Sequence, residues 1–135
     1  KLLDKMHVLS FRSIHSWFFV ASSICIGVSI ATHSIAGLWV GAAIRGIGFG
    51  GGVLAWNLGH QDYAPVEQSA RYMGLHVTLT GIRGLLAPAF GMALYSILMS
   101  KGYQAGPLVF YVGAMLSAIG GIGFILLAKA RLSSN

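Results

Sequence analysis

The sequence AAIRGIGFGGGVLAWN, residues 42–57, places one arginine beside a dense cluster of glycines in an otherwise uncharged apolar run. In water each glycine would destabilise a helix by about 1 kcal/mol relative to alanine. In lipid, glycines instead let neighbouring helices approach to backbone contact. Arg45 is costly there, at about 3 kcal/mol near the bilayer centre. The run therefore predicts a tightly packed membrane helix that carries a charge for a functional reason.

The composition of the chain supports a membrane protein. Of its 135 residues, 56% are hydrophobic and only 9% are charged, against about 25% charged in soluble domains. Its apolar runs exceed the roughly 18 residues that indicate a spanning helix. The nine Lys/Arg residues outnumber three Asp/Glu, but they lie mostly at the ends of apolar runs and not on one face. This placement excludes nucleic acid as a partner and predicts a lipid bilayer instead.

The predicted fold class is an all-α membrane protein, a four-transmembrane-helix bundle that follows a basic lead-in at residues 1–12. The expected spans are residues 13–31, 35–58, 66–99 and 106–128. The turn at residues 32–34 is so short that the first two spans must form an antiparallel hairpin. Because the chain opens without an initiator Met or a signal peptide, residues 1–135 are expected to be a single incomplete transmembrane domain.

The distribution of basic residues predicts the topology. Four spans put both termini and the hydrophilic loop at residues 59–71 on one side of the membrane. That side carries Lys1, Lys5, Arg12, Arg71, Lys129 and Arg131, and the other side carries Lys101 alone. By the positive-inside rule the termini are cytoplasmic. The expected location is the plasma, or inner, membrane.

Arg45 and Arg83 are the main functional candidates, because each lies near the middle of a predicted span. No Asp or Glu lies in residues 13–31, 35–58, 72–99 or 106–128. Carboxylates elsewhere in the protein, backbone carbonyls or water, or an anionic substrate could compensate the two charges. All three alternatives stay open at this point.

Two helical stripes accompany these arginines. His76, Thr80, Arg83 and Ala87 share one face of the third span, and Arg45, Gly48, Gly52 and Trp56 share one face of the second. The candidates for substrate binding or ion coupling are Arg45, Arg83, His76, Trp56 and Asn57. The candidates for helix packing or gating are Gly48, Gly52, Gly84, Pro88 and Gly91. Pro88 is expected to kink the third span.

The sequence contains no residue pattern that indicates an enzyme. The five histidines show no HExxH or other metal-ligand spacing, and one cysteine, Cys25, provides no zinc set. No nucleophile and base form a recognisable pair. The prediction is therefore a protein that is not an enzyme, with no catalytic residues, no metal and no cofactor.

Three motifs in order resemble the major facilitator superfamily, whose secondary transporters have two six-helix halves. LLDKM at residues 2–6 is similar to the end of the cytoplasmic loop between the second and third helices of a half. Arg45 and its glycines resemble the Arg-then-glycine motif of a later helix, and the run from Gly84 through Pro88 to Gly91 resembles the glycine-proline motif of the next. The resemblance implies the last four helices of the carboxy-terminal half, helices nine to twelve.

The function that this resemblance implies is part of a secondary active transporter. It would move a small solute by alternating access, with or without a coupling ion, and the remaining helices of the protein would be its partners. A small four-helix multidrug-type efflux protein is an alternative, although residues 13–31 lack the acidic group expected there. A non-transporting membrane assembly subunit or membrane enzyme is another. Eight further apolar spans encoded upstream of Lys1 would favour the transporter.

The predicted topology can be tested by labelling single cysteines in a Cys25→Ala background. A cysteine at Gln61 should react with an impermeant reagent from the cytoplasmic face, whereas cysteines at His33 and Lys101 should react only from the opposite face. The reverse pattern would show that the topology is inverted.

Overall fold

The computed structural model of the chain describes residues 7–59 and 65–133, which form four long α-helices and two short 3₁₀ helices. The long helices are α1 (Val8–Ala31), α2 (Ile35–Leu58), α3 (Ser69–Ser100) and α4 (Leu108–Leu132). The short ones are η2 (Val66–Gln68) before α3 and η3 (Tyr103–Ala105) before α4. No strand occurs in these two ranges, so the predicted all-α class is confirmed. The motif at residues 2–6 lies outside them.

Helix α1 begins earlier than the sequence predicted. Its first turn is capped by His7, whose Nδ1 accepts a hydrogen bond of 3.2 Å from the amide of Leu9. Arg12 therefore lies inside helix α1, whereas the sequence placed it in the lead-in before the first span. Residues before the first apolar run join the helix because this cap satisfies an amide that would otherwise lack a partner.

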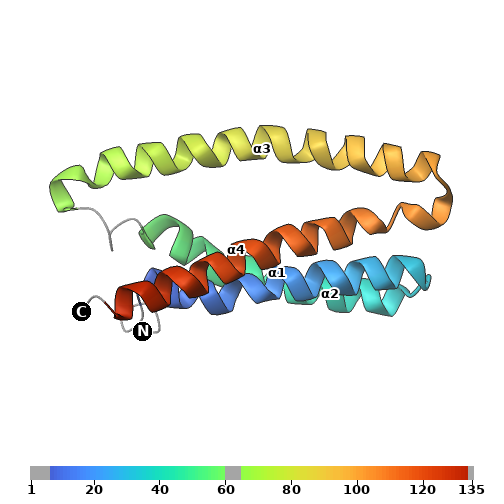
Figure 1. The fold of residues 1–135 in the computed structure, drawn as a ribbon, viewed down its shortest axis with the longest axis horizontal. Helices are drawn as coiled ribbons and strands as arrows, with labels where there is room; N and C mark the ends of the chain where they lie inside the picture. Colours follow the sequence, from blue (N-terminus) through green and yellow to red (C-terminus); the bar gives the residue numbers. More distant parts are fainter. Residues whose placement is uncertain (1–6, 60–64, 134–135) are drawn as a thin grey trace.

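A tight turn connects α1 to α2. His33 adopts the left-handed conformation with φ of 53°, which ends α1 sharply. The next residue, Ser34, then caps α2, because its hydroxyl accepts a hydrogen bond of 3.2 Å from the amide of Gly37. The two helices return along one another as the predicted antiparallel hairpin (Figure 1).

Three of the helices pack together and the fourth lies to one side. Helix α1 packs against both α2 and α4. Helix α3 lies apart from these three helices along most of its length and meets α4 near the turn that joins α3 to α4 (Figure 1). Helix α3 continues through Pro88 as one element and buries none of its residues. The three-helix group α1/α2/α4 is therefore the packed part of the fold.

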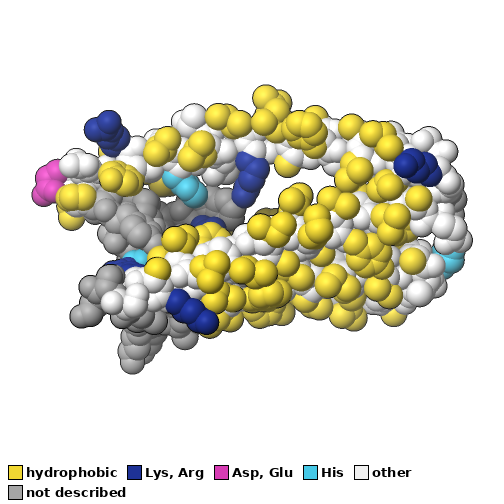
Figure 2. Space-filling model, viewed as in Figure 1, with side chains coloured by type: hydrophobic (Ala, Val, Ile, Leu, Met, Phe, Trp, Pro, Cys, Tyr) yellow, Lys and Arg dark blue, Asp and Glu magenta, His cyan; other side chains and the backbone are white. Residues whose placement is uncertain are grey.

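The packed part has small and polar side chains inside and large apolar ones outside. Its buried polar residues are His15, Ser22, Ser23 and Ser29, and its buried hydrophobic residues are Val8, Val20, Ala55 and Ala114. Hydrophobic side chains cover most of the visible face in Figure 2. This inversion is typical of helices packed in lipid, where large apolar groups gain nothing by leaving the surface. The chain is an integral membrane protein.

Three helices among the described residues are long and apolar enough to cross a membrane: Val8–Ala31, Val66–Ser100 and Leu108–Arg131. Helix α2, which includes residues outside the described side chains, is not among these three. It has 24 residues, which at 1.5 Å per residue is enough to span the hydrocarbon core. The membrane boundaries of all four spans remain predictions.

The glycine cluster packs on one face only. A Cβ added at Gly48 would lie 3.4 Å from the Phe19 ring, and one at Gly52 would lie 3.0 Å from the ring of His15. At Gly46 and Gly50 an added Cβ would meet nothing within 4 Å. Gly48 and Gly52 therefore face α1 at close range, whereas Gly46 and Gly50 face open space. The role of Gly48 and Gly52 in packing or gating stays a prediction.

Side chains of α1 donate hydrogen bonds to glycine carbonyls of α2 along this contact. The bonds are Ser22 Oγ to Gly41 O at 2.9 Å, Cys25 Sγ to Gly37 O at 3.4 Å, and His15 Nε2 to Gly48 O. His15 and Ser22 are seven residues apart, as are Gly41 and Gly48. This spacing keeps the contact on one seam of two antiparallel helices.

Replacing Gly41 by alanine should destabilise the hairpin. The added Cβ would lie 2.7 Å from Ile26 Cγ1 and 3.3 Å from the Ile26 amide nitrogen, so α1 and α2 must separate, at a cost of about 1–3 kcal/mol. Gly46→Ala, with open space at the same helix, is the matched control. Thermal unfolding in detergent should show a lower midpoint for Gly41→Ala alone. Equal losses in the two variants would contradict the packing described here.

Candidate functional site

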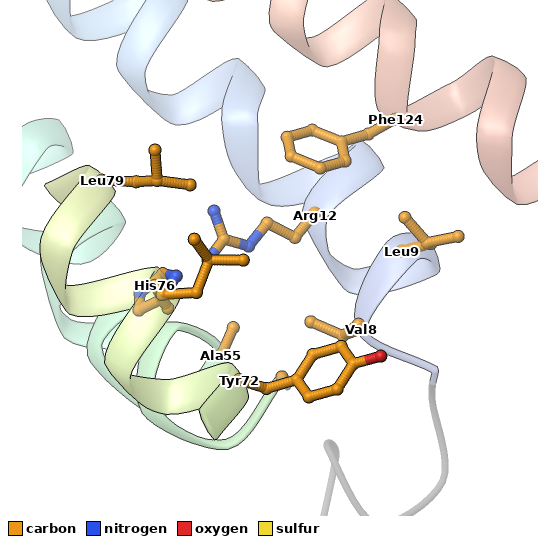
Figure 3. Close-up of a pocket in the computed structure, with 10 residues that line it drawn as sticks. Val8, Leu9, Arg12, Ala55, Tyr72, His76, Leu79 and Phe124 are labelled. Atoms are coloured by element: carbon orange, nitrogen blue, oxygen red, sulfur yellow. The ribbon is translucent and has the colours of Figure 1, made fainter. Parts of the chain in front are cut away.

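Two cavities lie between α3 and the three-helix group. The first, of about 560 Å³, is near the start of α1. Its walls include Val8, Leu9 and Arg12 of α1, Ala55 of α2, Tyr72, His76 and Leu79 of α3, and Phe124 of α4 (Figure 3). It is mostly apolar, with Arg12, His76 and Tyr72 as its polar side chains. We call it the Tyr72 cavity.

The second cavity, of about 460 Å³, is lined by three arginines, each from a different helix. Arg12 reaches it from α1, Arg45 from α2 and Arg83 from α3. The remaining walls are aromatic or small: His15, Ser16, Phe19, Ser23, Phe49, Gly113, Ser117, Gly120, Gly121 and Phe124. We call it the arginine cavity.

Arg12 belongs to both cavities. Its guanidinium carbon lies 5.7 Å from the centre of the Phe124 ring, a cation–π contact between α1 and α4. Figure 3 shows the side chain extending from α1 toward the segment of α3 that carries His76 and Leu79. Arg83 of α3 lines the same arginine cavity, so Arg12 and Arg83 bring two positive charges to one cavity.

Arg45 makes a similar aromatic contact within its own helix. Its guanidinium carbon lies 5.9 Å from the centre of the Phe49 ring, one helical turn further along α2. None of the described residues that line the arginine cavity is acidic. Glu67, which is exposed in η2, is the one acidic residue within residues 7–59 and 65–133. The charged side chains among the described residues of this cavity are therefore all positive.

His15 is a residue of the arginine cavity that sequence reasoning did not single out. It is buried, its Nε2 donates to the carbonyl of Gly48, and its ring lies 5.1 Å from Phe11 and 5.3 Å from Phe19 between centroids. A lone histidine in an apolar run matches no motif. The signal was the seven-residue spacing in the series His15, Ser22 and Ser29, which places all three on one helical face.

The structure brings together only part of the predicted site. Arg45 and Arg83 line the arginine cavity, whereas His76 lines the Tyr72 cavity. The side chains of Trp56 and Asn57 lie outside the described part of the chain. Gly84 and Pro88 are exposed on α3, and a Cβ added at Gly84 or Gly91 would meet nothing within 4 Å. A role for these three residues in packing or gating remains a prediction.

Two curated transporters resemble the chain. It is 31% identical over 101 residues to the MFS-type transporter gkaD of Penicillium citrinum, a match that covers 75% of this chain and 16% of that protein. It is 29% identical over 110 residues to the MFS-type transporter TwmF of Talaromyces wortmannii, covering 82% of this chain and 18% of that protein. No family model matches the chain, and no solved structure matches it significantly.

These matches cover most of the chain and agree with the three motifs in the sequence. The chain belongs to the major facilitator superfamily, the class of membrane transporters that the fold and motifs indicated. It spans less than a fifth of the length of the curated relatives it matches. Both relatives are named as transporters, and neither is named as an enzyme.

The positive character of the arginine cavity can be measured with a cysteine at Ser117, which lines it. Two methanethiosulfonate reagents are compared in a Cys25→Ala background, the anionic sulfonatoethyl and the cationic trimethylammonioethyl compound. The ratio of the anionic to the cationic labelling rate should be higher at Ser117→Cys than at Thr32→Cys in the exposed turn. Arg83→Gln should reduce this preference. A preference for the cationic reagent at Ser117→Cys would contradict the assignment.

Proposed function

We propose that the chain is the carboxy-terminal part, helices nine to twelve, of a secondary active transporter that moves a small anionic solute by alternating access. The single observation that supports this most strongly is the arrangement of three arginines from α1, α2 and α3 around one cavity. The transport activity is inferred from the membership of the chain in the major facilitator superfamily. The remaining helices of the full-length protein would complete the path, in the plasma membrane and with cytoplasmic termini.

The energetics favour an anion as the cargo. Placing an arginine near the bilayer centre costs about 3 kcal/mol, and the three arginines that line one cavity give it a positive charge that attracts an anion. A carboxylate or phosphate in the arginine cavity would offset this cost while it is bound. Arg45 and Arg83 would bind it, and His76, Trp56 and Asn57 are further candidates for binding or ion coupling.

Helix α3 is the element suited to motion in this proposal. It buries no residue and packs only lightly on α4, so it can change position without breaking a core. Gly84, Pro88 and Gly91 lie in its middle, where helices of transporters bend. Movement of α3 would change access to Arg83 and thereby release the solute on the other side.

Substitution of the two mid-span arginines tests the proposal. In the full-length protein, Arg45→Gln and Arg83→Gln should reach the membrane in normal amounts yet lose most uptake of labelled carboxylates into vesicles. The lysine variants should be intermediate, because they keep the charge and lose the planar fork. Arg131→Gln, at the exposed end of α4, is the matched control.

Two results would argue against this role. Lower expression or thermal stability in the glutamine variants, with the uptake per folded molecule unchanged, would make the arginines structural. If uptake and stability were both unchanged, neither arginine would have a functional role.

A further inference from the structure

We propose that His15 is the positioning residue of Arg45: through a row of aromatic rings it holds the guanidinium of Arg45 at the wall of the arginine cavity. This inference rests on the proposed function, in which Arg45 binds the solute. It adds a residue from the buried contact between α1 and α2 that acts on the solute only through Arg45.

The surroundings of His15 hold its ring in one orientation. The ring is buried, and its Nε2 donates a hydrogen bond to the carbonyl of Gly48 on α2. It stacks on Phe11, with ring centres 5.1 Å apart and an interplanar angle of 20°. A Cβ added to Gly52 would lie 3.0 Å from His15 Cε1, so the absence of a side chain there leaves room for the ring. These contacts make His15 a rigid support for the groups packed against it.

A row of aromatic contacts leads from His15 to Arg45. The rings of His15 and Phe19 meet edge to face, with 5.3 Å between their centres and an interplanar angle of 76°. The Phe19 ring meets the Phe49 ring of α2 in the same way, at 5.4 Å and 83°. The guanidinium carbon of Arg45 lies 5.9 Å from the centre of the Phe49 ring. Because edge-to-face pairs have a preferred geometry, each ring favours one orientation of the next. We call His15, Phe19 and Phe49 the aromatic row.

The aromatic row runs from the interior of the packed helices to the surface of α2. His15 is buried, Phe19 is half-buried, and Phe49 and Arg45 are exposed. All four residues line the arginine cavity. An exposed arginine loses side-chain entropy when it binds a solute. A Phe49 ring that is itself held in place reduces this loss, because the cation–π contact orients the guanidinium before the solute arrives.

The position of the Arg45 charge can be followed by cysteine labelling, without a transport measurement. The protein is the full-length Cys25→Ala variant with Ser117→Cys on the cavity wall, and the measured quantity is the ratio of the anionic to the cationic methanethiosulfonate labelling rate. His15→Gln keeps an amide donor for the contact with α2 and removes the ring. It should lower the ratio roughly twofold or more, because one unit charge moves away from the cavity. Phe19→Leu, which changes no titratable group, should lower the ratio to a similar extent.

Two variants are matched controls for these substitutions. Ser22→Ala removes the 2.9 Å hydrogen bond from Ser22 Oγ to Gly41 O, in the same helix contact, and leaves the aromatic row intact. It should lower the thermal unfolding midpoint and leave the labelling ratio unchanged. Phe18→Leu removes an exposed ring of α1 that is not among the described residues lining the arginine cavity. It should also leave the ratio unchanged.

A double-mutant comparison shows whether Arg45 is the charge that moves. When Arg45→Gln is already present, His15→Gln should not lower the ratio any further, because the charge that the aromatic row positions has been removed. A histidine that acted on the cavity by its own charge, or only by stabilising the fold, would have the same effect in both backgrounds.

Three results would overturn the inference. These are an unchanged ratio in Phe19→Leu or in folded His15→Gln, an equal fall in Ser22→Ala or Phe18→Leu, and a full further fall from His15→Gln in the Arg45→Gln background. If His15→Gln shows no unfolding transition, Phe19→Leu alone and combined with Arg45→Gln decides the question. The proposed function is tested separately, since it fails if Arg45→Gln and Arg83→Gln retain normal carboxylate uptake.

Discussion

The close approach of α1 to α2 is the contact on which the rest of the structure depends. Glycines on α2 remove the side chains that would hold the helices apart, and polar groups on α1 then reach the glycine carbonyls. In lipid there is no hydrophobic drive to bring apolar helices together, so this packing and these hydrogen bonds supply the association. Because His15 and Gly48 meet there, Arg12 and Arg45 lie on neighbouring helices facing the same cavity.

The position of α3 has a different physical basis. It lacks buried residues and is tied to α4 by a short turn in which Gly102 has φ of 130°. A Cβ added to its glycines at positions 74, 81, 84 and 91 would meet nothing within 4 Å in the described chain. An apolar helix with such a face is stable in a bilayer without a protein partner, and it remains able to pack against the further helices expected in a full-length transporter. Arg83 is therefore carried by the helix that is least firmly attached to the rest of the described chain.

The sequence predicted the helices well because apolar runs of this length have few other solutions in a chain so poor in charge. It singled out Arg45 and Arg83 as candidates, and both line the arginine cavity. That the two meet in one cavity could not be predicted, because the orientation of two distant helix faces cannot be read from periodicity alone. It missed Arg12, because a basic residue next to an apolar run reads as an interfacial anchor until the start of the helix is known. It also missed His15, whose role depends on a carbonyl that is 33 residues away in the chain.

Whether α3 brings Arg83 against Arg12 in the membrane is the most direct question about this structure. Cysteines at Arg12 and Arg83 in the full-length Cys25→Ala protein can be treated with a short bifunctional methanethiosulfonate. Cysteines at Ser16 and Gly121, where a Cβ added to Gly121 would lie 2.8 Å from the Ser16 hydroxyl, serve as the control for α1 and α4. The structure predicts an intramolecular cross-link in both pairs. A cross-link in the control pair but none between positions 12 and 83 would contradict the shared arginine cavity.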